Sequence, residues 1–230
     1  MTVHSMWPED EADRVAWRAP LLSRGSVLHR IADELAPQFI GVFAPETVER
    51  HVIESYQLLS ARAQITNHVL GMTKRFARER LRALGQAQGV LAKPVPEVLF
   101  VCVHNAGRSQ MAAGLLRYRA QGRVHVRSAG SAPTAEIPAL VLASMAELGL
   151  DVSGEFPKPL TDEVVGAADV VVTMGCGDAC PVYTGKRYLD WELAEHPGDP
   201  VRAVRSVRNE IDERVRFLLD QLSPAQPAGA

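Results

Sequence analysis

Residues 98–110 read Val-Leu-Phe-Val-Cys-Val-His-Asn-Ala-Gly-Arg-Ser-Gln, and this stretch decides the fold. The apolar run from Val98 to Val101 is typical of a buried strand that ends at Cys102. Five residues separate Cys102 from Arg108, and a helical pattern opens at Ser109. A strand, loop and helix in this order point backbone N–H groups and the positive end of the helix dipole at one spot. With a thiol and a guanidinium beside that spot, the loop is suited to hold a tetrahedral oxyanion against a thiolate.

The residue types inside the loop fit this chemistry. A thiol reacts as the thiolate, which helix N-termini and cations stabilise, so we predict Cys102 as nucleophile and Arg108 as the cation that binds the oxyanion. Asn105 suits a left-handed backbone, the Ser109 hydroxyl can donate a hydrogen bond to the thiolate, and Gly107 lets the backbone curl close to a ligand. The predicted oxyanion-binding residues are His104, Asn105, Ala106, Gly107, Arg108 and Ser109, with the His104 side chain expected to face solvent.

Composition limits the class of protein. At 230 residues and 47% apolar content, the chain can bury one good core and a smaller one. A formal net charge of -2 gives no reason to expect nucleic acid or an anionic membrane as partner, and no apolar stretch approaches the ~20 residues of a membrane span. Residues 1–20 lack the basic start and apolar middle of a signal peptide. Three cysteines, an odd number, favour reduced thiols in a cytoplasmic protein over a disulfide framework.

The N-terminal part is predicted to be mostly helical. Residues 1–20 are polar without a sustained period, so we expect a mobile leader. Residues 21–92 are predicted to form a small bundle of three amphipathic helices, at 26–36, from Pro45 and from Asn67. Homodimerisation and docking of a partner are both hypotheses for the bundle.

The third predicted helix is dense in charge. Its charged residues are Lys74, Arg75, Arg78, Glu79, Arg80 and Arg82. A helix that reads DNA presents such a face, but alternating Arg and Glu usually marks a solvated surface. We predict a solvated surface and no nucleic acid.

From residue 97 onward, short apolar runs alternate with helical ones. The pattern predicts an α/β fold with a four-stranded parallel sheet and helices on both faces. The predicted strands are 98–102, 124–127, 170–174 and 187–189, and the predicted helices are 109–120, 138–148, 162–167 and 201–222. The domain is expected to span 97–222, with loops at 128–130 and 151–159 and a disordered tail at 223–230. The oxyanion loop then lies at the carboxyl end of the first strand, where ligands bind in such sheets.

Residues 98–112 resemble the signature loop of the low-molecular-weight tyrosine phosphatase fold, and specifically of the arsenate reductases built on it. Residues 127–131 (Arg-Ser-Ala-Gly-Ser) are similar to the Ser-Ala-Gly of the family's second strand, and residues 207–211 (Val-Arg-Asn-Glu-Ile) to the Val-Arg-Asp-Glu-Ile of its last helix. The helical region before residue 97 is similar to an extension seen on some actinobacterial members. The resemblance implies a phosphatase-like fold that reduces arsenate to arsenite, with Ser128 as a further support of the loop.

Two further cysteines separate a reductase from a phosphatase. A phosphatase needs Cys102, Arg108 and a general acid, whereas this chain also carries Cys176 and Cys180 after the third predicted strand. The resemblance implies that Cys102 attacks arsenate, that Cys176 attacks Cys102 to release arsenite, and that Cys180 attacks Cys176. Thioredoxin would reduce the resulting disulfide, without a bound cofactor. A zinc site of three Cys and a His competes, but Cys-x2-Cys spacing is missing, so we expect no metal.

The proton donor is left open between two carboxylates. The resemblance implies an Asp four residues after a Trp and directly before a Pro. Counting from Trp191 places Glu195 at that position, whereas Asp199 stands directly before Pro200. We predict Glu195 by spacing and keep Asp199 as the second candidate. Potassium-binding relatives often carry a Glu where this chain has Ala113, so no cation is predicted.

Three other functions stay open. A mycothiol-dependent arsenate transferase would need Cys102 alone, with mycothiol and mycoredoxin as reductants. A low-molecular-weight protein tyrosine phosphatase would hydrolyse aryl phosphates. The alternative that is not an enzyme is an arsenite-responsive regulator, in which the bundle binds DNA and the three thiols bind As(III).

Overall fold

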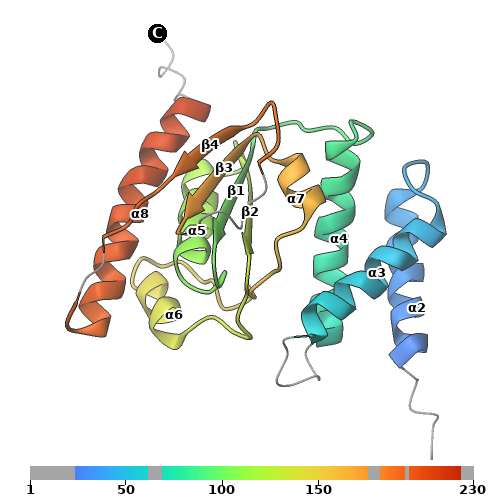
Figure 1. The fold of residues 1–230 in the computed structure, drawn as a ribbon, viewed down its shortest axis with the longest axis horizontal. Coiled ribbons are helices and arrows are strands. Elements are labelled where there is room, and N and C mark those ends of the chain that lie inside the picture. The colour runs from blue at the N-terminus through green and yellow to red at the C-terminus, as the bar shows by residue number, and fades with distance from the viewer. Residues whose placement is uncertain (1–23, 62–68, 176–181, 195–196, 224–230) are drawn as a thin grey trace, which may run out of the picture.

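The computed structural model describes residues 24–61, 69–175, 182–194 and 197–223. The predicted leader at 1–20 lies outside the described residues, as does the predicted tail except for Ser223. In chain order (Figure 1) the elements are α2 (Arg24–Leu35), the 3-10 helix η1 (Ala36–Phe39), α3 (Pro45–Ser60), α4 (Val69–Ala87), β1 (Glu97–Cys102), α5 (Arg108–Ala120), β2 (His125–Gly130), α6 (Ala139–Ala146), α7 (Asp162–Ala167), β3 (Val170–Met174), β4 (Arg187–Asp190) and α8 (Pro200–Leu222).

The four strands form one sheet in the order β2-β1-β3-β4, and every neighbouring pair is parallel. This confirms the predicted fold class. All six residues of β1 are buried, which explains the unbroken apolar run in the sequence, because a central parallel strand is covered on both faces. At its carboxyl end Cys102 pairs with Gly130 of β2 and with Met174 of β3.

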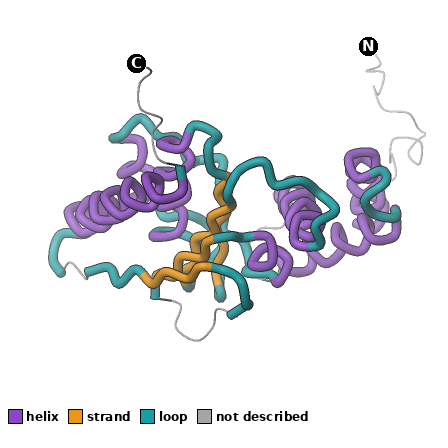
Figure 2. The backbone as a smooth tube through the Cα atoms, turned by 90° about the horizontal axis from the view of Figure 1, so that it is seen from above, coloured by secondary structure: helices purple, strands orange, loops and turns teal. Residues whose placement is uncertain are grey.

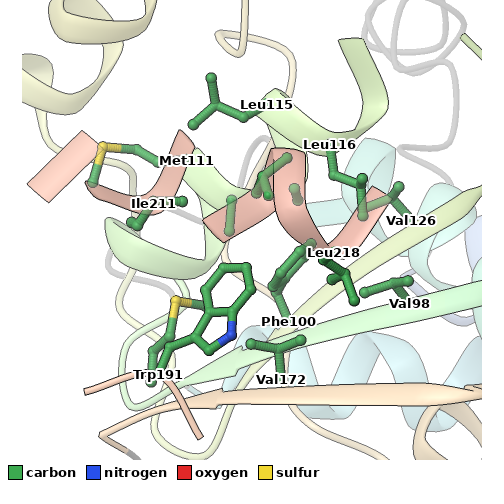
Figure 3. Close-up of a cluster of buried hydrophobic side chains, with 14 of the residues drawn as sticks. Val98, Phe100, Met111, Leu115, Leu116, Val126, Val172, Trp191, Ile211 and Leu218 are labelled. Carbon is green, nitrogen blue, oxygen red and sulfur yellow. The ribbon is translucent and has the colours of Figure 1, made fainter. Parts of the chain in front are cut away.

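Helices α5, α6 and α8 cover one face of the sheet. Val98 and Phe100 of β1 point into this core (Figure 3), where they meet Leu116 of α5 and Leu218 of α8. The ring of Trp191, which follows β4, lies 5.6 Å from the ring of Phe100. This packing fixes β1 against α5, and with it the loop that joins them.

The opposite face of the sheet is covered by α7 together with α4 from the N-terminal part. Leu99 and Val101 of β1 pack with Val165 of α7 and with Ala83 of α4. Other residues of α4, among them Leu81, pack into a separate core with α2 and α3. Helix α4 therefore belongs to two cores at once, and helices flank the strands on both sides (Figure 2).

The solvated surface predicted for the third helix is wrong at Arg80. This residue is 5% exposed, and its guanidinium pairs with Glu163 of α7 and donates to Glu54 at 3.1 Å and to Ser55 Oγ at 3.2 Å. The charge alternation is thus used for packing against α7 and α3, because a buried guanidinium is tolerated when carboxylates and a hydroxyl satisfy it.

The second strand is longer than predicted. Residues 128–130 were expected in a loop, yet they extend β2 and pair with Phe100, Val101 and Cys102. Ser, Ala and Gly have weak intrinsic strand preference, and pairing with a buried neighbour overrides it. No helix in the described ranges is long and apolar enough to cross a membrane.

Candidate active site

The loop between β1 and α5 wraps around the sulfur of Cys102, a residue that is 3% exposed. Asn105 has a φ of 47°, the left-handed backbone predicted for it. Its N–H group therefore turns inward and donates to Cys102 Sγ at 3.2 Å. Gly107 is the N-cap of α5, and its carbonyl accepts from the N–H of Met111 at 2.9 Å. The earlier N–H groups stay available for an anion, as at any helix start.

The Ser109 hydroxyl lies 3.0 Å from Cys102 Sγ. It accepts a hydrogen bond from Asn105 Nδ2 at 2.9 Å, so its single hydrogen is available to the sulfur. Both Ser109 and Asn105 are fully buried. The thiolate form of Cys102 thus has two donors, one from the backbone and one from a hydroxyl, which stabilise its negative charge.

Asn105 is held from outside the loop by residues that the sequence did not suggest. Its Oδ1 accepts from the N–H of Lys158 at 2.7 Å and from Gln110 Nε2 at 3.2 Å. The same Gln110 amide donates to the carbonyl of Asn105 and to the carbonyl of Phe156. Gln110 directly follows Ser109 in the first turn of α5. Its place next to the loop could have indicated a role in supporting the loop. Lys158 and Phe156 gave no such indication.

Arg108 is half-buried, and in the described part of the chain its guanidinium has no hydrogen bond or ion pair. It passes over Gly175 at the end of β3, where φ is +73° and a Cβ would lie 2.8 Å from Arg108 Nη1. A side chain at position 175 would therefore push the guanidinium aside. A cation without a protein anion can pair with an oxyanion ligand.

Gly130 gives the loop room on its other side. A Cβ there would lie 2.7 Å from the carbonyl oxygen of Val103 and 2.9 Å from Asn105. The predicted support from Ser128 is not a hydrogen bond, because its buried Oγ has no partner among the described residues. The segment 128–130 supports the loop through the close approach of Gly130.

A cleft of about 620 Å³ opens above the loop. Its floor includes Cys102, His104, Ala106, Gly107 and Arg108, and its walls are mostly apolar, formed by Met111, Val141, Leu193, Ala194, Ala203, Val204 and Val207. The His104 side chain is exposed, as predicted, and the cleft is also lined by Thr134, Ala135, Glu136 and Pro138. In the described residues no group of three or more His, Cys, Asp or Glu side chains could hold a metal ion.

Three predicted site residues, Cys176, Cys180 and Glu195, lie outside the described residues. Asp199 is described, and it is the N-cap of α8, where Oδ1 accepts from the N–H of Val201 at 3.1 Å. Its side chain is 51% exposed, and it is absent from the residues that line the cleft. The structure therefore gives Asp199 a capping role.

Comparisons with known proteins cover both parts of the chain. The model of the low molecular weight phosphotyrosine protein phosphatase family matches residues 97–226, and that of the protein-tyrosine-phosphatase-like N-terminal domain matches residues 28–85. The glutaredoxin arsenate reductase of Synechocystis sp. is 33% identical over 130 residues, which cover 55% of this chain and 98% of the relative. The putative arsenate reductase of Halobacterium salinarum is 32% identical over 130 residues, which cover 54% of this chain and 92% of the relative.

A solved structure from Corynebacterium glutamicum is similar over most of the chain. It is the Corynebacterium glutamicum thioredoxin-dependent arsenate reductase Cg_ArsC1', which superposes with a TM-score of 0.80 at 50% sequence identity. The superposition covers 87% of this chain and 98% of that one. It therefore includes N-terminal helices as well as the sheet.

Proposed function

The chain belongs to the low molecular weight phosphotyrosine protein phosphatase family, and from this premise we propose that it is an enzyme that reduces arsenate to arsenite. The observation that carries the proposal is the 50% identity, over 87% of this chain, to a reductase described as thioredoxin-dependent. Support also comes from the cleft that the buried Cys102 and Arg108 both line, and from the sequence, which carries two more cysteines that a phosphatase does not need.

Cys102 is the proposed nucleophile. Its thiolate attacks the arsenic of arsenate, and one arsenate oxygen leaves as water after protonation. Arg108 and the N–H groups at the start of α5 hold the other oxygens and stabilise the charge of the transition state. The proton is assigned to Glu195, because Asp199 is engaged as the cap of α8.

Cys176 and Cys180 are the proposed resolving thiols. The thiolate of Cys176 attacks the sulfur of Cys102, so an S–S bond forms, the S–As bond breaks, and its electron pair leaves with arsenic as arsenite. Cys180 then attacks Cys176 and returns Cys102 as a thiolate. Thioredoxin, an external dithiol, reduces the Cys176–Cys180 disulfide by two electrons, and no bound cofactor takes part. Such a cycle needs a reducing compartment, so the cytoplasm stays the predicted location, and homodimerisation through the N-terminal helices stays a prediction.

The test is a single turnover with arsenate in the absence of reductant, followed by blocking of free thiols and mass mapping of disulfides. We expect one arsenite released per chain and a Cys176–Cys180 disulfide, and neither from Cys102→Ser. In Cys180→Ser the Cys102–Cys176 disulfide should accumulate. Repeated turnover with thioredoxin and its reductase should then stop.

Other results would favour the other functions. Sustained turnover of Cys180→Ser with mycothiol and mycoredoxin would indicate a transferase that uses Cys102 alone. Rapid hydrolysis of aryl phosphates with Cys176 and Cys180 dispensable would indicate a phosphatase. Binding of operator-like DNA without any turnover of arsenate would indicate a regulator.

A further inference from the structure

A short segment between α6 and α7, residues 151–159, connects α4 to the active-site loop. We call this segment the strap. Phe156, inside the strap, is 6% exposed, and its ring packs with side chains of α3 and α4, namely Leu59, Val69 and Phe76. The carbonyl of the same residue accepts from Gln110 Nε2 at 3.1 Å. Phe156 therefore contacts the N-terminal helices through its ring. Through its carbonyl it contacts Gln110, the residue whose amide also donates to Asn105.

Lys158 makes a second connection of the same kind. Its side chain is 5% exposed, and Nζ donates to Glu79 Oε2 of α4 at 3.0 Å. Nζ also lies 3.6 Å from Glu155 Oε2, within ion-pair distance. Its backbone N–H donates to Asn105 Oδ1 at 2.7 Å. A buried ammonium needs an anionic partner. Glu79 is the carboxylate that is hydrogen-bonded to the Lys158 side chain, with Glu155 as a more distant second carboxylate, and the backbone of Lys158 fixes Asn105.

Arg75 is a third anchor of the strap. Its Nη1 donates to the carbonyl of Gly154 at 2.5 Å, and its guanidinium lies 5.2 Å from the centre of the Phe156 ring. Arg75, Phe76 and Glu79 share one face of α4, because residues three and four apart on a helix are neighbours. That face holds the strap at three points.

We propose that α4 positions the catalytic thiol through the strap, and that Glu79 is a positioning residue for Cys102. The path runs from Glu79 to Lys158 and on to Asn105, whose left-handed backbone directs its N–H at the sulfur. The inference rests on the proposed function only in taking Cys102 as the nucleophile. Its test measures the reactivity of that thiol, so failure of arsenate reduction and failure of positioning are separate results.

The test compares Glu79→Ala with Glu34→Ala in the full-length chain. Glu34 of α2 forms an ion pair of 2.5 Å with Lys74, which is also on α4, but neither side chain has a hydrogen bond or ion pair with the strap or the loop among the described residues. Each variant removes one carboxylate partner of a lysine: Glu79→Ala removes that of Lys158 in the strap, and Glu34→Ala removes that of Lys74 in α4. Cys176→Ser and Cys180→Ser are added to every protein, because they leave Cys102 as the single thiol of the three.

The measurement is the rate of alkylation of Cys102 by iodoacetamide as a function of pH, with and without inorganic phosphate as the oxyanion probe. In Glu79→Ala, Asn105 is held less firmly and the thiolate loses donor strength. We expect the pH midpoint of alkylation to rise, and the phosphate concentration that protects the thiol to rise about fivefold, which corresponds to about 1 kcal/mol. Glu34→Ala should match the parent in the pH midpoint of alkylation and in the phosphate concentration that protects the thiol.

Two results would overturn the proposal. If Glu79→Ala keeps the parent's pH profile and phosphate protection while its Tm falls, α4 only packs against the strap. If Glu34→Ala shifts the profile as much as Glu79→Ala does, the cause is loosening of the helices and not the path through Lys158. Where Glu79→Ala does not fold, Glu79→Gln replaces it, with Glu34→Gln as its control and the same two criteria.

Discussion

Two donors meet at the sulfur of Cys102, and the origin of each differs. The N–H of Asn105 is fixed by backbone conformation, whereas the hydroxyl of Ser109 is oriented by the hydrogen bond it accepts from Asn105 Nδ2. A hydrogen bond to a charged group contributes roughly 1.5–3 kcal/mol. Loss of the Ser109 hydroxyl should therefore lower the reactivity of the Cys102 thiolate.

Replacing Ser109 by Ala should slow the alkylation of Cys102 and the release of arsenite in a single turnover by about one to two orders of magnitude, because the thiolate loses a donor. The matched control is Ser128→Ala, which removes a buried hydroxyl that has no partner among the described residues. That change should leave both rates unchanged and the Tm equal or higher, since it removes an unsatisfied polar group. Equal losses of rate in the two variants would contradict the assignment.

The backbone of Gly175 sets the position of Arg108. A Cβ at Gly175 meets Arg108 Nη1, whereas Gly149, with an almost identical φ of +72°, has nothing within 4 Å. Gly175→Ala and Gly149→Ala should both lose about 1–2 kcal/mol of stability from the left-handed backbone. Only Gly175→Ala should also weaken phosphate binding, by about tenfold, measured as inhibition of Cys102 alkylation. Equal phosphate affinity in both variants would show that Arg108 tolerates a side chain there.

Among the elements, β1, β2 and α4 are joined by a buried ion pair. Glu97 opens β1 and is 1% exposed, and Arg127 of β2 donates to it at 3.1 Å. Arg127 also donates to the carbonyl of Glu79 at 3.0 Å and to Gln86 Oε1 at 2.9 Å, both in α4. Burial alone would raise the pKa of Glu97, but His125 and Arg127 outweigh it and lower the pKa to about 2.

This ion pair predicts acid sensitivity. A carboxylate with a lowered pKa contributes stability above its unfolded value near 4.5, and the contribution is lost as the pH falls from there toward 2. Glu97→Gln should lower the free energy of unfolding by about 2–3 kcal/mol at pH 7. The difference from the parent should shrink below pH 4.5, as measured by urea unfolding at several pH values. A difference that stays constant with pH would show that charge is not its cause.

Glu147→Gln is the control for this measurement. The pKa of Glu147 is also about 2, because Arg205 and Arg208 donate to it, but its side chain is 36% exposed. Solvent and salt screen an exposed pair. Its effect on stability should therefore be smaller than that of Glu97→Gln and should decrease further in high salt.

Prediction from the sequence found the local features of the fold and the site, and it missed the features that depend on contacts between residues far apart in the chain. The apolar run of β1, the five residues to Arg108 and the left-handed Asn105 follow from short-range rules, and the structure agrees with them. The burial of Arg80 and the use of Lys158 depend on partners about 80 residues away, which no periodicity reports. The capping role of Asp199 was readable, since Asp before Pro is a common helix start.

At the scale of the whole molecule, α4 joins two cores and a loop. Its residues pack with α2 and α3, with β1 and α7, and with the strap. A helix whose burial is shared in this way cannot leave one core without disturbing the other. We therefore expect α4 to open together with the sheet, whereas α2, which contacts only η1, α3 and α4 among the main element contacts, can open alone.

Hydrogen exchange in the presence of phosphate tests this coupling. A ligand that binds only the native state stabilises it by about 2.7 kcal/mol at a hundredfold excess over its Kd. Exchange of the α4 amides should slow by about the same factor as that of the β1 amides, roughly a hundredfold, if both open in one cooperative step. The α2 amides serve as the internal control and should exchange at a rate that phosphate does not change. Protection confined to β1 and α5 would mean that α4 opens with the other N-terminal helices, independently of the sheet.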